Sequence, residues 1–437
     1  MADASAQSRL NREVGLVGAM MMGLGSIIGT GVFVSIGIAA GVTGPSVILA
    51  IIVGGFVATF NGLSSAQLAA NHPVSGGTYE YGYRWLNPAL GFTAGWMFLC
   101  AKSASAATAA LGFSGYALNL FELDPSTLTA PVAVGVVVVM TLLVLGGIKR
   151  SNWTNIAIVS LTLASLAYFI LAGMPTAMKN GTENLSPFFQ PNDLRRAFSG
   201  FFEACALMFV AYTGYGRIAT LGEEVVNPRY TIPRAMIITL VVTSMLYAAV
   251  GVIGIASSGS KLLADATTEK AAPLVVVARE FDSVTAEKVI AVGAVTAMLG
   301  VLLNLILGLS RVALAMGRRG DLPHALGRLN QSQSTPTVAV TVVGTGIALL
   351  SLIGDVKTTW SFSAFTVLVY YALTNLAAIQ LSAEERLFPK FIPWLGLISC
   401  LSLAFWVEPY IWIAGVALIA GGLVFQFIMR QLARRGS

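Results

Sequence analysis

Glycine and hydroxyl residues gather in the middle of one apolar run near the start of the chain. From Gly23 to Phe33 the sequence reads GLGSIIGTGVF, so that Ser26 and Thr30 lie among four glycines. A glycine inside a helix costs about 0.5–1 kcal/mol relative to alanine. Where a helix breaks in lipid, freed amide N–H groups and the positive end of the next half-helix can hold a carboxylate, and freed carbonyls can accept from an amine.

A packing role competes with this interpretation. Gly25 and Gly29 have GxxxG spacing, which lets two membrane helices approach closely. On the form of the motif alone, packing is favoured. Gly31 directly after Thr30 weakens the helix further, and the hydroxyl groups lie at the same depth. These additions favour a broken helix that binds a molecule with both a carboxylate and an amine, such as an amino acid.

A second interrupted run should then occur in another half of the chain. The sixth apolar run provides it, because Phe201 to Gly216 reads FFEACALMFVAYTGYG, in which Tyr212, Thr213 and Gly214 interrupt the apolar pattern. The two interruptions are five runs apart. This spacing predicts two five-helix repeats and two additional helices.

The elements that must position these residues are membrane helices. The chain has 437 residues, of which 56% are hydrophobic and 11% charged, whereas soluble domains carry about 25% charged residues. A helix needs about 20 apolar residues to cross about 30 Å of hydrocarbon. Twelve such runs are expected, with approximate limits Val14–Ala40, Pro45–Ala70, Leu90–Leu120, Ala130–Ile148, Trp153–Met174, Ala197–Leu221, Pro233–Ser257, Lys288–Met316, Thr337–Gly354, Thr358–Leu381, Phe391–Trp406 and Pro409–Met429.

These runs predict an all-α integral membrane protein with a single transmembrane domain. The repeats would cover about residues 14–174 and 197–381, and the extra helices about 391–429. The net charge of +6 comes from residues scattered over the ends of the runs, which does not indicate a nucleic-acid partner. Most Lys and Arg fall on the cytoplasmic side if both termini are cytoplasmic, which predicts a multi-pass protein of the cell (inner) membrane.

Motifs of enzymes and cofactor sites are not found. The sequence has no GxxxxGK[ST], HExxH or GxSxG, and Cys100, Cys205 and Cys400 form no CxxC pair. We therefore expect no enzymatic activity, no cofactor and no metal.

Two ionisable residues lie inside predicted spans. Lys102 is about 12 residues into the third run, which is about 18 Å along a helix and so near the membrane centre. Such residues usually face the interior or a water-filled cavity. Lys102 could have a structural role, as a fixed ion pair or a hydrogen-bonded ammonium with Glu203 as one possible partner, or it could exchange a proton during a transport cycle. The sequence leaves both roles open.

Four motifs together resemble the amino acid/polyamine/organocation permease superfamily, whose members share the LeuT-type inverted-repeat fold. They are GSIIGTGVF in the first run, PVSGGTYEY from Pro73 to Tyr81, AYTGYGRIATLGEEVVNPRYTIPRA from Ala211 to Ala235, and SRVALAMGRRGDLP from Ser310 to Pro323. The similarity covers nearly the whole chain. It implies a secondary transporter in which the first and sixth helices are broken.

The resemblance also implies a substrate site. The backbone of the first break would hold the carboxylate and the amine, a carbonyl near Thr213 would take the amine, and the ring of Tyr212 would close over the substrate. The implied residues are Ser26, Ile27, Gly29, Thr30 and Gly31, with Val210, Ala211, Tyr212, Thr213 and Gly214.

The sequence departs from relatives at three places. Gly216 replaces an acidic residue, Ala297 to Gly300 reads AMLG where sodium-coupled relatives have hydroxyls, and Asn155 to Thr162 reads NIAIVSLT without the lysine of proton-coupled relatives. Small or medium neutral amino acids are the expected substrates, moved by alternating access with proton coupling or exchange. Cationic amino acids, polyamines or other organic amines are the alternative, and a channel is the leading rival mechanism.

Charged residues after the sixth run allow two interpretations. Glu223 and Glu224 could form permanent cytoplasmic ion pairs, or a gate that breaks and reforms. Their candidate partners are Arg217, Arg229, Arg234, Arg318 and Arg319. The connection from Gly259 to Glu287 has a mixed apolar and charged pattern, which predicts short helices over the outer face.

Overall fold

Helices form nearly all of the regular structure. The computed structural model describes residues 14–74, 76–147, 152–189, 193–220, 224–330 and 335–435. Within these ranges the β structure is one isolated bridge, between Val14 and Val225. In lipid each backbone polar group must be satisfied inside the protein, which helices achieve within one segment. The all-α prediction is confirmed.

The first predicted span is divided into α1 (Leu16–Ile27), α2 (Thr30–Phe33) and α3 (Ser35–Thr43). The sixth is divided into α9 (Leu194–Tyr212), a 3₁₀ turn η2 (Thr213–Tyr215) and α10 (Gly216–Ala219). The other spans contain α4 (Val47–Asn71), α6 (Pro88–Leu120), α7 (Pro125–Leu145), α8 (Asn152–Asn184), α11 (Pro228–Lys270), α13 (Ala286–Arg319), α14 (Thr337–Ile353), α15 (Val356–Ile379), α16 (Phe391–Ala404) and α17 (Pro409–Arg435). Short helices α5 (Thr78–Trp85), α12 (Pro273–Ala278), η1 (Gly44–Ser46) and η3 (His324–Gly327) lie in connections.

Each of the twelve predicted runs therefore contains a helix or a broken helix. Among the described residues, nine helical segments are long and apolar enough to cross a membrane, and α14 and α16 are shorter apolar helices. α6 is a further long helix of 33 residues, and its length is about 50 Å at 1.5 Å per residue. The protein is a multi-pass membrane protein.

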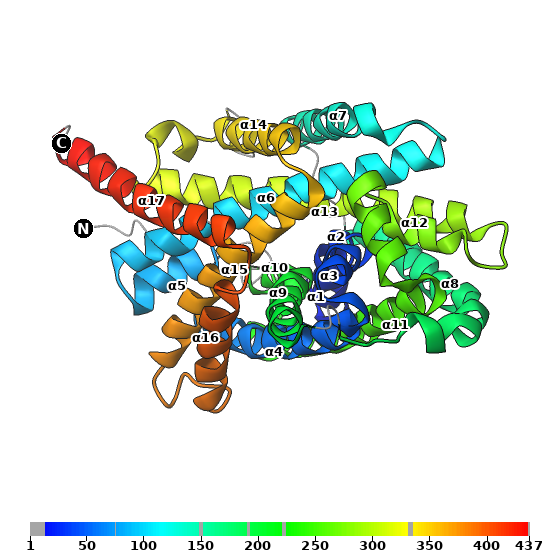
Figure 1. Cartoon of the computed structure of the whole chain (residues 1–437). Helices are drawn as coiled ribbons and strands as arrows, with labels where there is room; N and C mark the ends of the chain where they lie inside the picture. Colours follow the sequence, from blue (N-terminus) through cyan, green and yellow to red (C-terminus); the bar gives the residue numbers. More distant parts are fainter. Residues whose placement is uncertain are drawn as a thin grey trace.

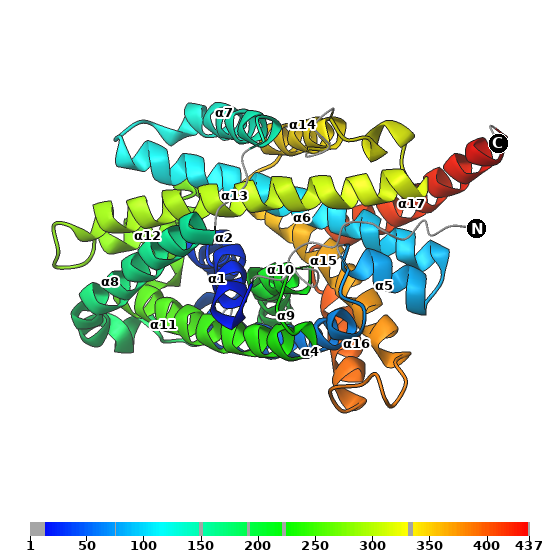
Figure 2. The ribbon, with the colours of Figure 1, turned by 180° about the vertical axis from the view of Figure 1, so that it is seen from behind.

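The two broken spans lie side by side at the centre of the bundle. Figures 1 and 2 show α1, α2 and α3 next to α9 and α10, with α4, α6, α11, α13 and α15 around them. Packing between elements agrees, because α2 contacts α9 and α13, and α1 contacts η2 and α10. α7 and α14 pack against each other on the outside of α6. The breaks are thus surrounded by long helices.

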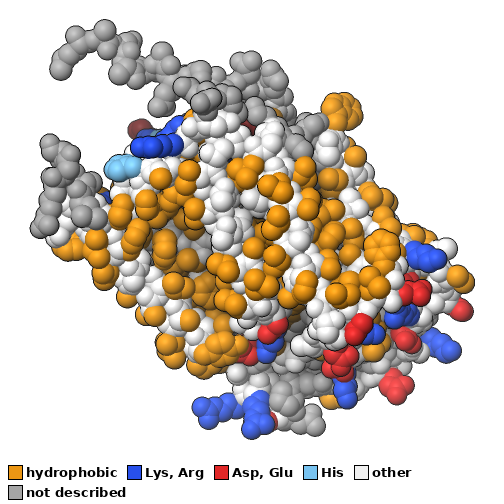
Figure 3. Space-filling model, turned by 90° about the horizontal axis from the view of Figure 1, so that it is seen from above, with side chains coloured by type: hydrophobic (Ala, Val, Ile, Leu, Met, Phe, Trp, Pro, Cys, Tyr) orange, Lys and Arg blue, Asp and Glu red, His pale blue; other side chains and the backbone are white. Residues whose placement is uncertain are grey.

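The surface is divided into a belt and two ends. Figure 3 shows a broad band of hydrophobic side chains between two ends where charged side chains gather. On α7, Val139 is 52% exposed and Leu142 is 60% exposed. Such a contiguous exposed apolar surface is rare on soluble proteins and fits contact with lipid tails.

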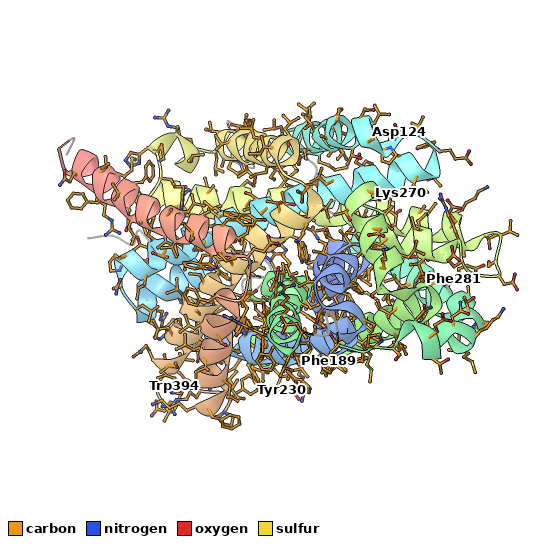
Figure 4. All side chains as sticks on the ribbon, viewed as in Figure 1. Asp124, Phe189, Tyr230, Lys270, Phe281 and Trp394 are labelled. Atoms are coloured by element: carbon orange, nitrogen blue, oxygen red, sulfur yellow. The ribbon has the colours of Figure 1, made fainter. Side chains whose placement is uncertain are left out.

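The predicted short helices between the seventh and eighth spans are present. α11 continues past its span through a kink at Gly259, whose φ of 78° favours glycine. α12 follows and packs against α13. Figure 4 shows Lys270 and Phe281 of this connection toward the same end of the molecule as Asp124. The connection packs over α3, where a Cβ on Gly37 would overlap the Thr267 hydroxyl.

Candidate functional site

The break in the first span opens the backbone between Ile28 and Thr30. Ile28 is extended, with φ of −79° and ψ of 101°, and Gly29 also leaves helical geometry, with φ of −179° and ψ of −118°. The Gly29 carbonyl accepts from Val32 and Phe33, which starts the next half-helix. Among the described residues, no hydrogen bond engages the amide N–H groups of Gly29, Thr30 and Gly31. The predicted break is confirmed, and it leaves three amide donors available at the start of α2.

The break in the sixth span is much milder. Tyr212 and Gly216, on either side of η2, keep helical dihedral angles, so the helix tightens into a 3₁₀ turn and does not open. Gly214 in this turn lies directly against the first break, because a Cβ added to it would overlap the Ser26 carbonyl oxygen. Glycine therefore lets the two broken spans cross with backbone against backbone.

A small cavity of about 30 Å³ lies at this crossing. From the predicted site it brings together Ser26, Ile27, Thr30, Gly31, Lys102, Val210, Ala211, Thr213 and Gly214. Four further lining residues were not predicted, namely Ser105, Val301, Leu305 and Trp360. A water molecule needs about 10–15 Å³ of such volume. The cavity has room for about two waters, and an amino acid needs the half-helices to move apart.

The polar atoms of the cavity differ in how they are paired. The Thr30 hydroxyl is buried, with the residue 4% exposed, and has no hydrogen-bond partner among the described residues. Lys102 is 8% exposed, and its Nζ donates to Thr213 Oγ1 at 2.9 Å. Thr213 Oγ1 in turn donates to the Val210 carbonyl at 2.8 Å. The first break thus offers a donor, while the second is already engaged by the lysine.

Tyrosine hydroxyls hold the carbonyls of both breaks. Tyr247 donates to the Ile27 carbonyl at 2.8 Å and to the Ala211 carbonyl at 3.3 Å. Tyr371 donates to the Thr213 carbonyl at 3.2 Å. Trp360 fixes α15 to α9 through a 3.0 Å bond from Nε1 to the Leu207 carbonyl. No local pattern predicts these partners, because they come from α11 and α15, far along the chain.

Two predicted residues of the site lie elsewhere. Gly29 does not line the cavity; it packs against α13, where an added Cβ would lie 2.6 Å from Val301 Cγ2. The Tyr212 hydroxyl donates to the Ile51 carbonyl of α4 at 3.0 Å. The tyrosine ring therefore packs toward α4 and does not cover the cavity in this conformation. Trp360 is the aromatic residue that lines it.

Glu203 is not the partner of Lys102 among the described residues, where Lys102 is a hydrogen-bonded ammonium. Lys102 donates to Thr213 of the sixth span. Glu203 lies on that sixth span too, but ten positions before Thr213, which is about 15 Å along a helix. There Glu203 interacts electrostatically with Lys357 and Glu408, which form an ion pair of 2.7 Å. The sequence alone could not predict these partners, because it does not show that Glu203 and Lys102 lie at different depths in the bundle.

A second cavity of about 190 Å³ continues from Ser26 toward the start of α1. Its lining includes Met22, Ser26, Asn155, Arg217, Glu224, Asn304, Leu307 and Arg311. Of the predicted gating residues, Glu224 lies here, and Glu223 lies outside the described residues. Arg311 was not predicted. Ser26 belongs to both cavities, so they are adjacent.

The other predicted arginine partners are distributed differently. Arg319 forms an ion pair with Glu80 at 2.6 Å, and not with Glu224. Arg229 donates to the Glu384 carbonyl at 3.2 Å, and the guanidinium of Arg234 lies 3.5 Å from the centre of the Tyr230 ring. Arg319, Arg229 and Arg234 thus have partners other than Glu224.

Comparison with known proteins agrees with the fold and the crossing. The model of the amino acid permease family matches residues 18–435. An uncharacterized transporter of Mycobacterium tuberculosis is 39% identical over 426 residues, covering 98% of this chain and 93% of the relative. The branched-chain amino acid permease BcaP of Bacillus subtilis is 28% identical over 430 residues, covering 92% and 90%. Cationic amino acid transporter 4 of Mus musculus is 25% identical over 406 residues, covering 88% and 62%. The chain therefore belongs to the amino acid permease family, within the amino acid/polyamine/organocation superfamily.

Proposed function

We propose that this protein is a secondary transporter that binds a small or medium neutral amino acid where the two broken spans cross. The observation that carries the proposal is the set of unpaired donors at the first break. The amides of Thr30 and Gly31 and the Thr30 hydroxyl, from residues that line the cavity, have no partner among the described residues. A buried donor without a partner costs about 1–3 kcal/mol, so a ligand that accepts from these groups gains that energy.

The carboxylate of the substrate fits this end of α2. Free backbone N–H groups that point toward one place favour a negative group there. The α-amine then faces the carbonyl oxygens of Ser26 and Ala211 across the cavity. A carbonyl oxygen has two lone pairs, so carbonyls that already accept one hydrogen bond can accept from the amine as well.

The size of the cavity favours small or medium substrates. Gly31, Ala211 and Gly214 line it with little side-chain volume, but Val301, Leu305 and Trp360 limit its other side. The branched-chain permease of Bacillus subtilis supports a neutral substrate, since it is similar over nearly its whole length. The similarity to the cationic transporter covers only 62% of that protein.

The two adjacent cavities support alternating access as the mechanism. The larger cavity reaches from Ser26 to Glu224 and Arg311, whereas the described lining of the crossing cavity includes no residue of α3 or of the first half of α9. We propose that one helix bundle rocks against the other around the crossing, which opens these sides in turn. The larger cavity would face the cytoplasm, in agreement with the positive-inside bias.

The proposal is tested by a thermal-shift screen of the purified protein with the twenty amino acids and common polyamines, followed by uptake of each hit into proteoliposomes. A neutral amino acid should stabilise the protein most and be taken up. Its amide and its decarboxylated analogue should compete poorly, because each leaves one pole of the site unpaired. A decarboxylated amine that competes equally well would support an organic amine transporter, and single-channel current would support a channel.

Proton coupling is proposed separately, on the position of Lys102 in the cavity. Uptake of the screened substrate should increase when the outside of the proteoliposome is made more acidic than the inside. Uptake that does not respond to the proton gradient would exclude coupling without affecting the substrate proposal.

A further inference from the structure

Lys102 is the one ionisable side chain among the described residues that line the crossing cavity. It is 8% exposed on α6, and its Nζ lies 2.9 Å from Thr213 Oγ1. No carboxylate lines the cavity within the described ranges. Glu203 belongs to the separate group with Lys357 and Glu408. The field of the Lys102 ammonium inside the cavity is therefore not offset by a nearby acid.

The position of Lys102 in the cavity decides which part of the substrate it faces. The backbone groups proposed to bind the substrate carboxylate and amine belong to α1, α2 and α9. The remaining lining residues are Lys102 and Ser105 of α6, Val301 and Leu305 of α13, and Trp360 of α15. We place the side chain of a bound amino acid toward these three helices, because in the proposed site its main-chain groups occupy the side of the two breaks.

We propose that Lys102 sets the charge selectivity of this side-chain subsite by rejecting cationic side chains and admitting neutral ones. The inference rests on the proposed function. Two like charges that are a few ångströms apart in a partly buried site repel strongly, because an effective dielectric constant of about 20 weakens the repulsion much less than water does. A substrate ammonium near Lys102 would meet this repulsion in addition to the cost of leaving water.

The experiment compares amino acids that differ only in an ammonium or a methyl group at the end of the side chain. Ornithine and norleucine form one such pair, and diaminobutyrate and norvaline form a smaller one. Dissociation constants for each are measured with the full-length protein in nanodiscs. The wild type should bind the cationic member at least about tenfold more weakly than the neutral member.

Substitutions of Lys102 test whether this residue causes the difference in affinity between the cationic and the neutral amino acid of each pair. Lys102→Met should reduce the discrimination within each pair by about tenfold, whatever happens to overall affinity, and Lys102→Arg should retain it. Lys102→Gln serves if the methionine variant does not fold, because an amide can still donate to Thr213. Lys357→Met is the matched control, since Lys357 carries the same charge outside the cavity, and it should leave the ratio unchanged.

Three outcomes overturn the inference. Equal binding of both members by the wild type would show that no charge filter exists. A ratio that is the same in Lys102→Met and the wild type would assign the discrimination to another group. A fall in affinity by the same factor for all four amino acids in Lys102→Met would mean that the ammonium holds the carboxylate common to them. Failure of every amino acid to bind would contradict the proposed function itself.

Discussion

The two broken spans cross at one cavity, but the two breaks differ in backbone geometry and in hydrogen bonding. In the first span Ile28 and Gly29 leave helical geometry, and the following amides stay unpaired within the described structure. In the sixth span the chain only tightens into a 3₁₀ turn, and Tyr371, Lys102 and Thr213 itself supply hydrogen bonds to it. The first break is open toward a ligand, and the second is held by the protein.

This difference between the two breaks means that one mainly affects substrate binding and the other mainly affects the stability of the protein. Unpaired donors at the first break add nothing to the stability of the empty protein, but they provide energy to a ligand that accepts from them. Paired groups at the second break stabilise the empty protein and keep its backbone in place. Substitutions at the first break should therefore mainly change affinity, whereas substitutions at the second should mainly change thermal stability.

The largest effect is expected where the two breaks touch. Gly214→Val places a side chain against the Ser26 carbonyl, and overpacking of this kind costs about 1–3 kcal/mol. Substrate affinity should fall by about 10- to 100-fold, and the melting temperature should also fall. Gly308→Val is the control, because a Cβ at Gly308 meets no atom within 4 Å. Wild-type affinity in Gly214→Val would mean that the crossing is not the binding site.

Substitution of Gly29 tests whether the position of the first break affects substrate affinity independently of its hydrogen-bonding groups. Gly29→Ala brings a Cβ to 2.6 Å from Val301 Cγ2, so α2 must shift and affinity should fall by about tenfold. Val301→Ala removes the clashing methyl groups. The double variant should recover affinity relative to Gly29→Ala, as a double-mutant cycle would show. Additive losses in the cycle would exclude this contact as the cause.

A pair of threonine substitutions tests the comparison directly. Thr30→Val removes a hydroxyl without a partner, so the empty protein should keep its melting temperature while substrate affinity falls by about tenfold. Thr213→Val leaves the buried Lys102 without its acceptor and should lower the melting temperature. The same loss of stability in both variants would show that the two breaks do not differ.

The smallest effect is expected for the tyrosine hydroxyls, each of which contributes about 1 kcal/mol. Tyr247→Phe removes bonds to both breaks, through Ile27 and Ala211, whereas Tyr371→Phe removes one to the second break. Both variants should melt at a slightly lower temperature, and only Tyr247→Phe should lower affinity, by a few-fold. An effect of Tyr371→Phe on affinity at constant stability would place that hydroxyl at the substrate.

The sequence predicted the helical class, the approximate places of the membrane helices and the positions of both breaks, but α8 and α11 run well beyond the predicted limits. Long apolar runs and clustered glycines are local properties, so neighbouring residues suffice to predict them. It did not predict Trp360, Val301 and Leu305 at the cavity, because these residues belong to apolar runs with no distinguishing pattern. The direction of Tyr212 was also missed, since Ile51 on another helix supplies its hydrogen-bond acceptor.

The sequence by itself determined that this chain crosses a membrane and where its first and sixth spans are interrupted, because hydropathy and backbone preference act within a few residues. Only the tertiary structure decided that the first interruption opens while the second tightens, and that Lys102 bonds to Thr213 and not to Glu203. These outcomes depend on which helices lie beside each break, and a buried polar group takes the partner that packing brings within reach.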